Sequence, residues 1–288
     1  DIGSNAVRML ICYVLIHEDE YFFQKNQYIR LPLRLGEDSF KTGSISDDKI
    51  NTLSNALLSF KYTMKVHGVE HYKIYATSAL RDAKNSDDVI KQIYDLTGMK
   101  IKLIDGLKEA KVIAMGNPVE KLDFDNTYLY VDVGGGSTEY SIVRRGDDKK
   151  SKSFNIGTVR LLNNLVDELV FDEIKEWINE NIEDESKLKV FATGGNINKI
   201  QDMTRTKSGK PISYLSIKDL YNNLLDKDIN DRMIKYNLSP DRADVIIPAL
   251  RIFISTMEWA NTNKLFVPKV GLVDGMIKEI HNSMNSVN

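Results

Sequence analysis

The opening part of the chain follows a strand-like pattern of hydrophobic positions. Residues 7–16 are almost continuously apolar, residues 17–20 form a polar turn, and residues 21–34 supply further strand. Apolar runs of this kind, separated by turn residues, are typical of antiparallel strands. We therefore expect three antiparallel strands at the start of the chain.

A long helix is expected next. Apolar residues recur at three- and four-residue steps from Ile50 to Met64, Ser46 precedes them as a suitable N-cap, and Gly68 ends the run. Shorter elements then follow in the order strand, helix, strand, helix. We expect them at residues 72–76, 87–96 and 101–104, with the last helix starting at about Lys108.

The pattern restarts after residues 117–126, which hold a proline and several acids and are typical of a connector. A new series of strands follows the connector, then helices, then another strand. We expect strands at residues 127–133, 139–145 and 151–155, helices within 158–182, and a strand at 189–192.

Two pairs of short strings indicate that the second half of the chain repeats the first. Residues 1–5, DIGSN, parallel residues 132–138, DVGGGST, and residues 74–81, IYATSALR, parallel residues 190–197, VFATGGNI. Each string stands where a strand meets a turn, and both pairs keep the same order. We therefore predict an α/β fold of two duplicated domains, each a mixed sheet flanked by helices, with a cleft between them.

The domain boundary is expected at the connector. We assign residues 1–118 to the first domain and residues 119–288 to the second, and an alternative packs the closing helix back on the first domain. A length of 288 residues and a hydrophobic content of 42% are sufficient for two cores.

Charge and cysteine content narrow the class of protein. Lys and Arg number 39 against 41 Asp and Glu, so we expect no nucleic-acid partner, and a polyanion must bind at a local site. The single cysteine, Cys12, excludes an internal disulfide and fits the reducing cytoplasm. The apolar run at residues 7–16 carries Arg8 and is shorter than the ~20 residues that span a bilayer, so we expect a core strand there and no membrane segment. No signal peptide is visible in this sequence.

The candidate chemistry centres on a glycine-rich turn between two strands of the second half. Glycines leave the backbone N–H groups of a turn open to a phosphate, although a flexible hairpin also explains a triple glycine without any ligand. The residues that we expect to bind phosphate here are Gly134, Gly135, Gly136, Ser137 and Thr138.

Two acids flank this turn. Asp132 ends the apolar strand before it, where a carboxylate is unfavourable for a core and suited to a cation that accompanies phosphate. Glu139 would bring a second carboxylate to the same metal, or would be an ordinary solvated strand residue. The string at the start of the chain would act in the same way, with Gly3, Ser4 and Asn5 as donors and Asp1 near the metal.

A second anion subsite is predicted where strands meet helices. Thr77, Ser78 and Arg81 follow a strand and open a helix, so hydroxyls, free N–H groups and a guanidinium point one way. Helix capping explains Thr77 and Ser78 without a ligand, and Arg81 also fits an exposed side chain. Gly194 and Gly195 take the equivalent place in the second half.

The candidate general base is an acid near the end of a strand. Glu109 lies at the start of a helix after the strand at 101–104, and Asp105 is close by. A carboxylate in this place could take a proton from an attacking water. Acids are also common in the first turn of any helix because of its dipole, so the residues alone leave this role open.

Nine short strings, in order along nearly the whole chain, carry a family resemblance. They are DIGSNAVRML (1–10), RLG (34–36), ATSALRDA (76–83), DGLKEAKVI (105–113), VDVGGGSTE (131–139), GTVRL (157–161), ATGGN (192–196), RADVIIPA (242–249) and GLVDG (271–275). Together they resemble the exopolyphosphatase and guanosine pentaphosphate phosphohydrolase family, within the actin-like ATPase superfamily of ribonuclease H-like fold. Longer relatives carry a C-terminal helical domain, so the chain resembles the short, two-domain form.

The resemblance implies roles for the candidate residues. Glu109, the acid before Ala110 in a Gly-x-x-Glu-Ala pattern, would be the base that activates water, and we place Arg81 beside it as a catalytic residue. Mg²⁺ would bind at Asp132 and Glu139, and the glycine turn would hold phosphate.

The chain departs from the family pattern at two positions. The family usually has a further acid where this chain has Lys108, and an arginine where it has Val273. Lys108 would add a positive charge at the cleft or point to solvent. Val273 cannot make the phosphate contact of an arginine.

The expected function is removal of the terminal phosphate from polyphosphate or guanosine pentaphosphate by a water that Glu109 activates with Mg²⁺ present. One alternative is an ATP-dependent kinase of the same superfamily, which would need a site for an acceptor hydroxyl. Another is a non-catalytic sensor of guanosine polyphosphates, which could dispense with the base. The expected partner is the phosphate substrate, with a homodimer as an option.

Overall fold

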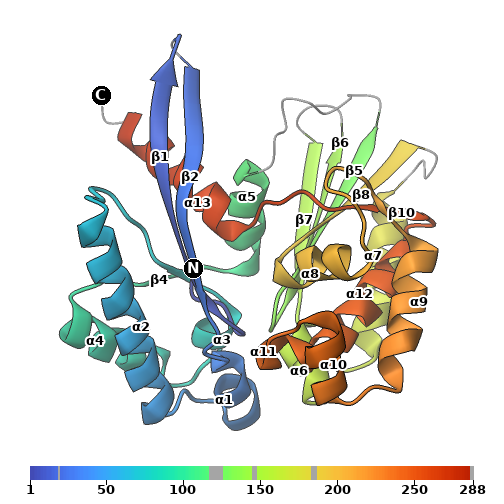
Figure 1. Ribbon diagram of the computed structural model, residues 1–288, viewed down its shortest axis with the longest axis horizontal. Helices are drawn as coiled ribbons and strands as arrows, with labels where there is room; N and C mark the ends of the chain where they lie inside the picture. The colour runs from blue at the N-terminus through green and yellow to red at the C-terminus, as the bar shows by residue number, and fades with distance from the viewer. Residues whose placement is uncertain (19, 117–125, 145–147, 183–186, 286–288) are drawn as a thin grey trace. The chain divides into compact units, whose positions relative to one another are not determined.

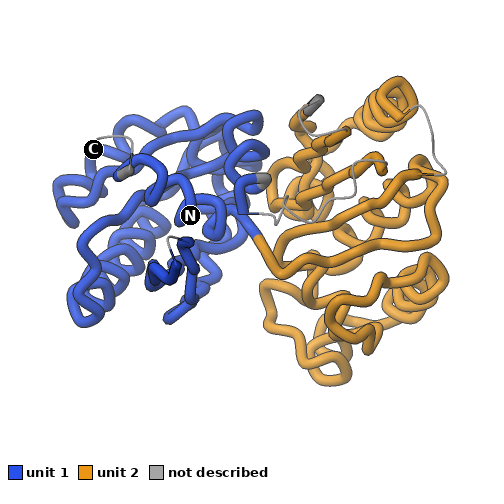
Figure 2. The backbone as a smooth tube through the Cα atoms, turned by 90° about the horizontal axis from the view of Figure 1, so that it is seen from above, with its two compact units in different colours: residues 1–116, 271–288 blue, residues 117–270 orange. Residues whose placement is uncertain are grey.

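The chain divides into two compact units (Figure 2). Unit 1 combines Asp1–Gly116 with Gly271–Asn288, and unit 2 is Asn117–Val270. The helices among the described residues include none long and apolar enough to cross a membrane. The computed structural model describes residues 1–18, 20–116, 126–144, 148–182 and 187–285.

The sheet of unit 1 is built from a long hairpin and two short parallel strands (Figure 1). Strand β1 (Val7–His17) pairs antiparallel with β2 (Glu20–Leu31), and β3 (Tyr75–Ala76) pairs parallel with β4 (Lys102–Leu103). Ile2 joins the two pairs, because it bridges Val7 antiparallel and Ala76 parallel. The resulting order is β2, β1, Ile2, β3, β4.

The expectation of three antiparallel strands at the start was wrong. The described residues of this region form two strands, and helix α1 (Leu35–Thr42) follows them. Pro32, next after β2, has no N–H to donate to a sheet. Arg34 then takes a φ of +56°, which ends the extended backbone before the helix begins.

Two helices of unit 1, α2 (Asp47–Val66) and α4 (Ser86–Thr97), lie close to the bounds that the sequence pattern predicts. The N-cap of α2 is Ser46, whose side chain accepts a hydrogen bond from Lys49 N. Helix α4 ends at Gly98, whose φ is +69°. The core of this unit lies between α2, α4 and the sheet. The remaining helices of unit 1 are α3 (Ser78–Arg81), α5 (Gly106–Gly116) and α13 (Leu272–Asn285).

Unit 2 has a mixed sheet in the order β7, β6, β5, β8, β10, β9. Strand β5 pairs antiparallel with β6 and parallel with β8, and β8 pairs parallel with β10. The strands are β5 (Thr127–Val133), β6 (Thr138–Arg144), β7 (Asp148–Phe154), β8 (Leu188–Thr193), β9 (Ile212–Ser213) and β10 (Lys264–Phe266).

Helices complete unit 2 around a large apolar core, with Val131 and Val190 from the sheet and Phe253 from a helix. Helix α12 (Ile246–Trp259) is mostly apolar and contributes many of the buried side chains. The helices are α6 (Thr158–Leu162), α7 (Leu169–Asn181), α8 (Gly195–Met203), α9 (Tyr214–Leu225), α10 (Ile229–Tyr236), α11 (Pro240–Ala243) and α12 (Ile246–Trp259).

The central strands of the two sheets share one order. Ile2 in unit 1 stands between β1 and β3 as β5 in unit 2 stands between β6 and β8, with one antiparallel and one parallel neighbour in each case. The predicted α/β fold class with mixed sheets is confirmed. The predicted connector, apart from Asn126, lies outside the described residues.

Candidate functional site

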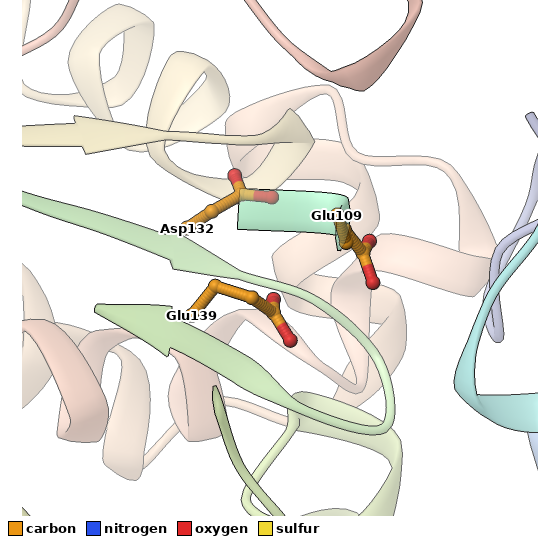
Figure 3. Close-up of side chains that lie close together, drawn as sticks. All are labelled: Glu109, Asp132 and Glu139. Carbon is orange, nitrogen blue, oxygen red and sulfur yellow. The ribbon is translucent and has the colours of Figure 1, made fainter. Parts of the chain in front are cut away.

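The glycine turn joins β5 to β6 and brings two acids face to face. Gly134 N donates to Ser137 O at 3.0 Å, and Asp132 is the register partner of Glu139 on the neighbouring strand. Carboxylate oxygens of these two residues lie within 4.8 Å of each other (Figure 3). Like charges directly opposite on a sheet destabilise it, so a bound cation would relieve this pair.

Each of the two carboxylates is held by a hydroxyl of its own. Thr193 Oγ1, on β8, donates to Asp132 Oδ1 at 2.6 Å. Ser153 Oγ, on β7, donates to Glu139 Oε1 at 2.8 Å. Such bonds orient carboxylates that bind metals. Neither hydroxyl was predicted from the sequence, because the register of β8 and β7 against their neighbours cannot be read from the residues.

The carbonyl groups of the turn are engaged by the start of α6. Thr158 N donates to Gly134 O at 3.0 Å, Val159 N to Gly135 O at 2.8 Å, and Arg160 Nε to Gly136 O at 2.8 Å. The N–H groups of Gly135 and Gly136 donate to no residue in the described part of the chain. The turn therefore has fixed carbonyls and available N–H groups, which is an arrangement suited to an anion.

Gly157 is required by this packing. A Cβ atom at Gly157 would lie 2.4 Å from the carbonyl carbon and oxygen of Gly135. We expect Gly157→Ala to lower the free energy of unfolding of the chain by about 1 to 3 kcal/mol, because the backbone of the turn must shift. Denaturant unfolding followed by circular dichroism measures this, with Gly271→Ala as the control, since a Cβ there has open space. Equal stability of the two variants would contradict the close contact.

The chain leaves β8 at a glycine beside Asp132. Gly194 has a φ of +106°, and a Cβ there would lie 3.0 Å from Asp132 Oδ1. Gly195 then begins α8, and a guanidinium nitrogen of Arg242 would lie 3.6 Å from a Cβ at Gly195. Arg242 was not among the predicted site residues, although it begins one of the family strings.

The turn at the start of unit 1 has the same backbone hydrogen bond but different chemistry. Gly3 N donates to Ala6 O at 3.1 Å, as Gly134 N does to Ser137 O. Arg8 stands where Glu139 stands in unit 2, and its Nη1 lies 2.7 Å from Asp1 Oδ2. Because this ion pair already neutralises Asp1, we leave Asp1 out of the metal site that we propose.

Three other predicted residues of unit 1 come together around this turn. Ser4 Oγ and Ser78 Oγ lie 2.9 Å apart and are buried, so the turn contacts the start of α3 directly. Asn5 O accepts from Arg34 N at 3.1 Å. Two of the proposed phosphate donors of unit 1, Ser4 and Ser78, thus meet in the structure.

Thr77 and Arg81 flank α3. Thr77 occupies the N-cap position, but its side chain makes no capping hydrogen bond, so capping does not account for its hydroxyl. Arg81 Nη1 donates to Ile104 O at 3.1 Å, and its Nε donates to Asp82 Oδ1 at 3.1 Å. These contacts hold the guanidinium within unit 1, and the Arg81 side chain is 24% exposed, so it is not fully solvated.

The two acids near α5 have different surroundings. Asp105 Oδ1 accepts from Lys108 N at 2.7 Å, which is the geometry of a helix cap. Glu109 lies in the first turn of the same helix with a side chain that is buried, at 9% exposure (labelled in Figure 3). Helix capping therefore accounts for Asp105. Burial of a carboxylate costs free energy, so the buried position of Glu109 favours a functional role for this residue.

Comparisons with known proteins agree with the family resemblance. The model of the Ppx/GppA phosphatase family matches residues 16–284. The chain is 32% identical to a bifunctional 3-dehydroquinate synthase/phosphatase of Fusobacterium nucleatum, over 97% of this chain and 46% of that protein. It is 26% identical to a guanosine-5'-triphosphate,3'-diphosphate pyrophosphatase of Photobacterium profundum, over 99% of this chain and 59% of that protein. The chain thus spans about half the length of these curated relatives.

Solved structures show the same fold. An exopolyphosphatase from Cytophaga hutchinsonii superposes with a TM-score of 0.81 at 21% identity, covering 98% of this chain and 96% of that one. A Ppx/GppA enzyme of Aquifex aeolicus superposes with a TM-score of 0.76 at 22% identity, covering 96% and 97% of the two chains. Because the family model matches most of the length of this chain, the chain belongs to the Ppx/GppA phosphatase family.

Proposed function

We propose that this chain removes the terminal phosphate from inorganic polyphosphate, guanosine pentaphosphate or both, by attack of water with Mg²⁺ present. The observation that supports this most strongly is the pair of facing carboxylates, Asp132 and Glu139, at the foot of a turn with available N–H groups. The names of two relatives, a guanosine-5'-triphosphate,3'-diphosphate pyrophosphatase of Photobacterium profundum and a putative exopolyphosphatase of Haemophilus influenzae, refer to this substrate class.

The donor set fits Mg²⁺. Asp132 and Glu139 offer only oxygen atoms, which hard divalent cations prefer, and neither residue is near a cysteine or histidine among the described residues of the turn. When bound there, Mg²⁺ would neutralise charge on the phosphate oxygens. Thr193 and Ser153 would keep the two carboxylates in a single orientation, which lowers the cost of assembling the site.

Backbone and side-chain groups of the protein would have separate roles in the transfer of the phosphate to water. Backbone N–H groups of Gly135 and Gly136 would bind oxygens of the terminal phosphate. The Glu109 carboxylate would accept a proton from water as the water oxygen bonds to the terminal phosphorus. The bond from that phosphorus to the bridging oxygen breaks, and the shortened chain or nucleotide leaves with the bridging oxygen.

A parallel assay tests the proposal. We expect phosphate release from long-chain polyphosphate or guanosine pentaphosphate with Mg²⁺, little release from ATP, and loss of activity with EDTA. A phosphate monoester such as p-nitrophenyl phosphate belongs in the panel, because the Fusobacterium relative is named a phosphatase without a stated substrate. Rapid hydrolysis of the monoester alone would contradict the proposed substrate class. Tight binding of guanosine pentaphosphate without turnover would instead favour the alternative function, a non-catalytic sensor of guanosine polyphosphates.

A further inference from the structure

Helices α5 and α13 of unit 1 touch backbone to backbone (Figure 1). A Cβ on Gly275 of α13 would lie 1.7 Å from Val112 O, and a Cβ on Gly116 would lie 3.0 Å from Gly275 N. Position 275 therefore requires glycine for this approach, and a side chain at Gly116 would be a tight fit. Apolar side chains that include Val112 and Met276 form a small core beside the contact. The course of α5 is thus set by α13.

One carboxylate of α13 also ties the start of α5. Lys108 Nζ donates to one oxygen of Glu279, and the hydroxyl of Tyr75, on β3, donates to the other. Lys73 Nζ lies 3.6 Å from the same carboxylate. The Glu279 side chain is 16% exposed, so these contacts form in a largely enclosed place. Glu279 therefore joins α13, α5 and β3 through one side chain.

Glu279 is charged at neutral pH. Its burial opposes ionisation, but hydrogen bonds from Lys108 and Tyr75 and the charges of Lys73 and Lys108 outweigh burial and lower its pKa. Burial and the bond to Glu279 raise the pKa of Tyr75, so its phenol stays protonated and can donate. Hydrogen bonds to an ionised acceptor are stronger than those between neutral groups. The tie is therefore stronger than a solvated surface ion pair.

We propose that Glu279 is a positioning residue, which holds Lys108 and thereby the first turn of α5 in the orientation that aims the Glu109 carboxylate. The inference rests on the proposed function of Glu109 as general base. Successive residues of an α-helix project about 100° apart around its axis, so fixing Lys108 against α13 sets the direction in which Glu109 leaves the helix. Lys108, which stands where the family usually has an acid, thus has a partner in α13 and serves to position the first turn of α5.

The test compares removal of this tie with removal of another ion pair of α13. Lys108→Met removes the donor of the tie, Glu279→Gln removes its charge and one of its two acceptor oxygens, Lys108→Arg keeps the charge of Lys108, and the double variant tests coupling. Lys25→Met is the matched control, because Lys25 pairs with Asp274 of α13 from β2 and not from α5. Steady-state kinetics on guanosine pentaphosphate or polyphosphate, and hydrogen exchange of the α5 amides, are measured for each.

We expect either single variant to lower kcat about 10-fold with KM within about 2-fold, since a displacement of about 1 Å can cost about 100-fold. The double variant should lose no more kcat than the single variants do, because both single variants remove the same interaction between Lys108 and Glu279. Lys108→Arg should keep most of kcat, and Lys25→Met all of it. Faster exchange at the start of α5 should accompany the loss.

Three results would overturn the inference. Unchanged α5 exchange in Glu279→Gln would show that the tie does not hold the helix, whatever the activity. Loosened α5 with normal kcat would show that the tie is structural only, as would a rise in KM without a fall in kcat. Wild-type protein that releases no phosphate from any substrate would instead refute the proposed function, and with it the catalytic purpose of the tie.

Discussion

Glu109→Gln is expected to lower kcat at least ~100-fold while substrate affinity stays nearly unchanged, because an amide keeps the shape of the side chain but cannot accept a proton from water. Glu109 is the buried acid of α5, in the first turn of that helix. Rapid-mixing phosphate release measures turnover, and calorimetry with guanosine pentaphosphate measures binding.

Asp105→Asn is the matched control for this prediction. Asp105 lies four residues before Glu109, and its Oδ1 caps α5 by accepting from Lys108 N. Asparagine retains that acceptor and is an equally good N-cap, so we expect near-normal turnover. If Asp105→Asn loses activity and Glu109→Gln keeps it, the base has been assigned to the wrong acid.

The second large effect concerns the facing carboxylates of unit 2. We expect Asp132→Asn, and likewise Glu139→Gln, to raise the Mg²⁺ concentration for half-maximal activity at least ~10-fold, since an amide attracts the ion less strongly. Without divalent ions the same variants should be slightly more stable than the wild type, by up to about 1 kcal/mol, because one of two opposed like charges is gone. Titration of activity and thermal unfolding with and without Mg²⁺ measure both effects.

The control for the carboxylate pair is Glu173→Gln, which neutralises an exposed acid on α7 of the same unit. It should match the wild type in both measurements. Equal Mg²⁺ stabilisation of the wild type and Asp132→Asn would contradict a metal site at this turn, because a ligand that binds only the folded protein must stabilise it in proportion to its affinity.

Much of the fold could be predicted because local patterns specify it. The bounds predicted for β5 are those observed, and Ser46 caps α2 as expected. Helix α1 was missed because its eight residues are too few to show a clear period, and the strand pattern before it ends at Pro32 without another marker. Predictions of element type failed where a backbone turn at a non-glycine residue, Arg34, decided the path.

The site could be predicted in part. Asp132 and Glu139 lie seven residues apart across a short turn, and that spacing alone brings them opposite each other on paired strands. The same spacing separates Asp1 from Arg8, so the ion pair that neutralises Asp1 was readable from the sequence and was missed. Thr193 was not readable, because its contact with Asp132 depends on pairing between strands far apart in the chain. Ser153 was not readable because the residues do not fix the register of β7 on β6.

The position of water attack tests the central claim most directly. A single turnover of guanosine pentaphosphate by the wild type in ¹⁸O-labelled water, with Mg²⁺, should place one ¹⁸O atom in the released inorganic phosphate and none in the nucleotide product. That pattern requires water to bond to the terminal phosphorus. Label in the nucleotide, or transfer of the phosphate to an added acceptor without label, would contradict hydrolysis at the terminal phosphate.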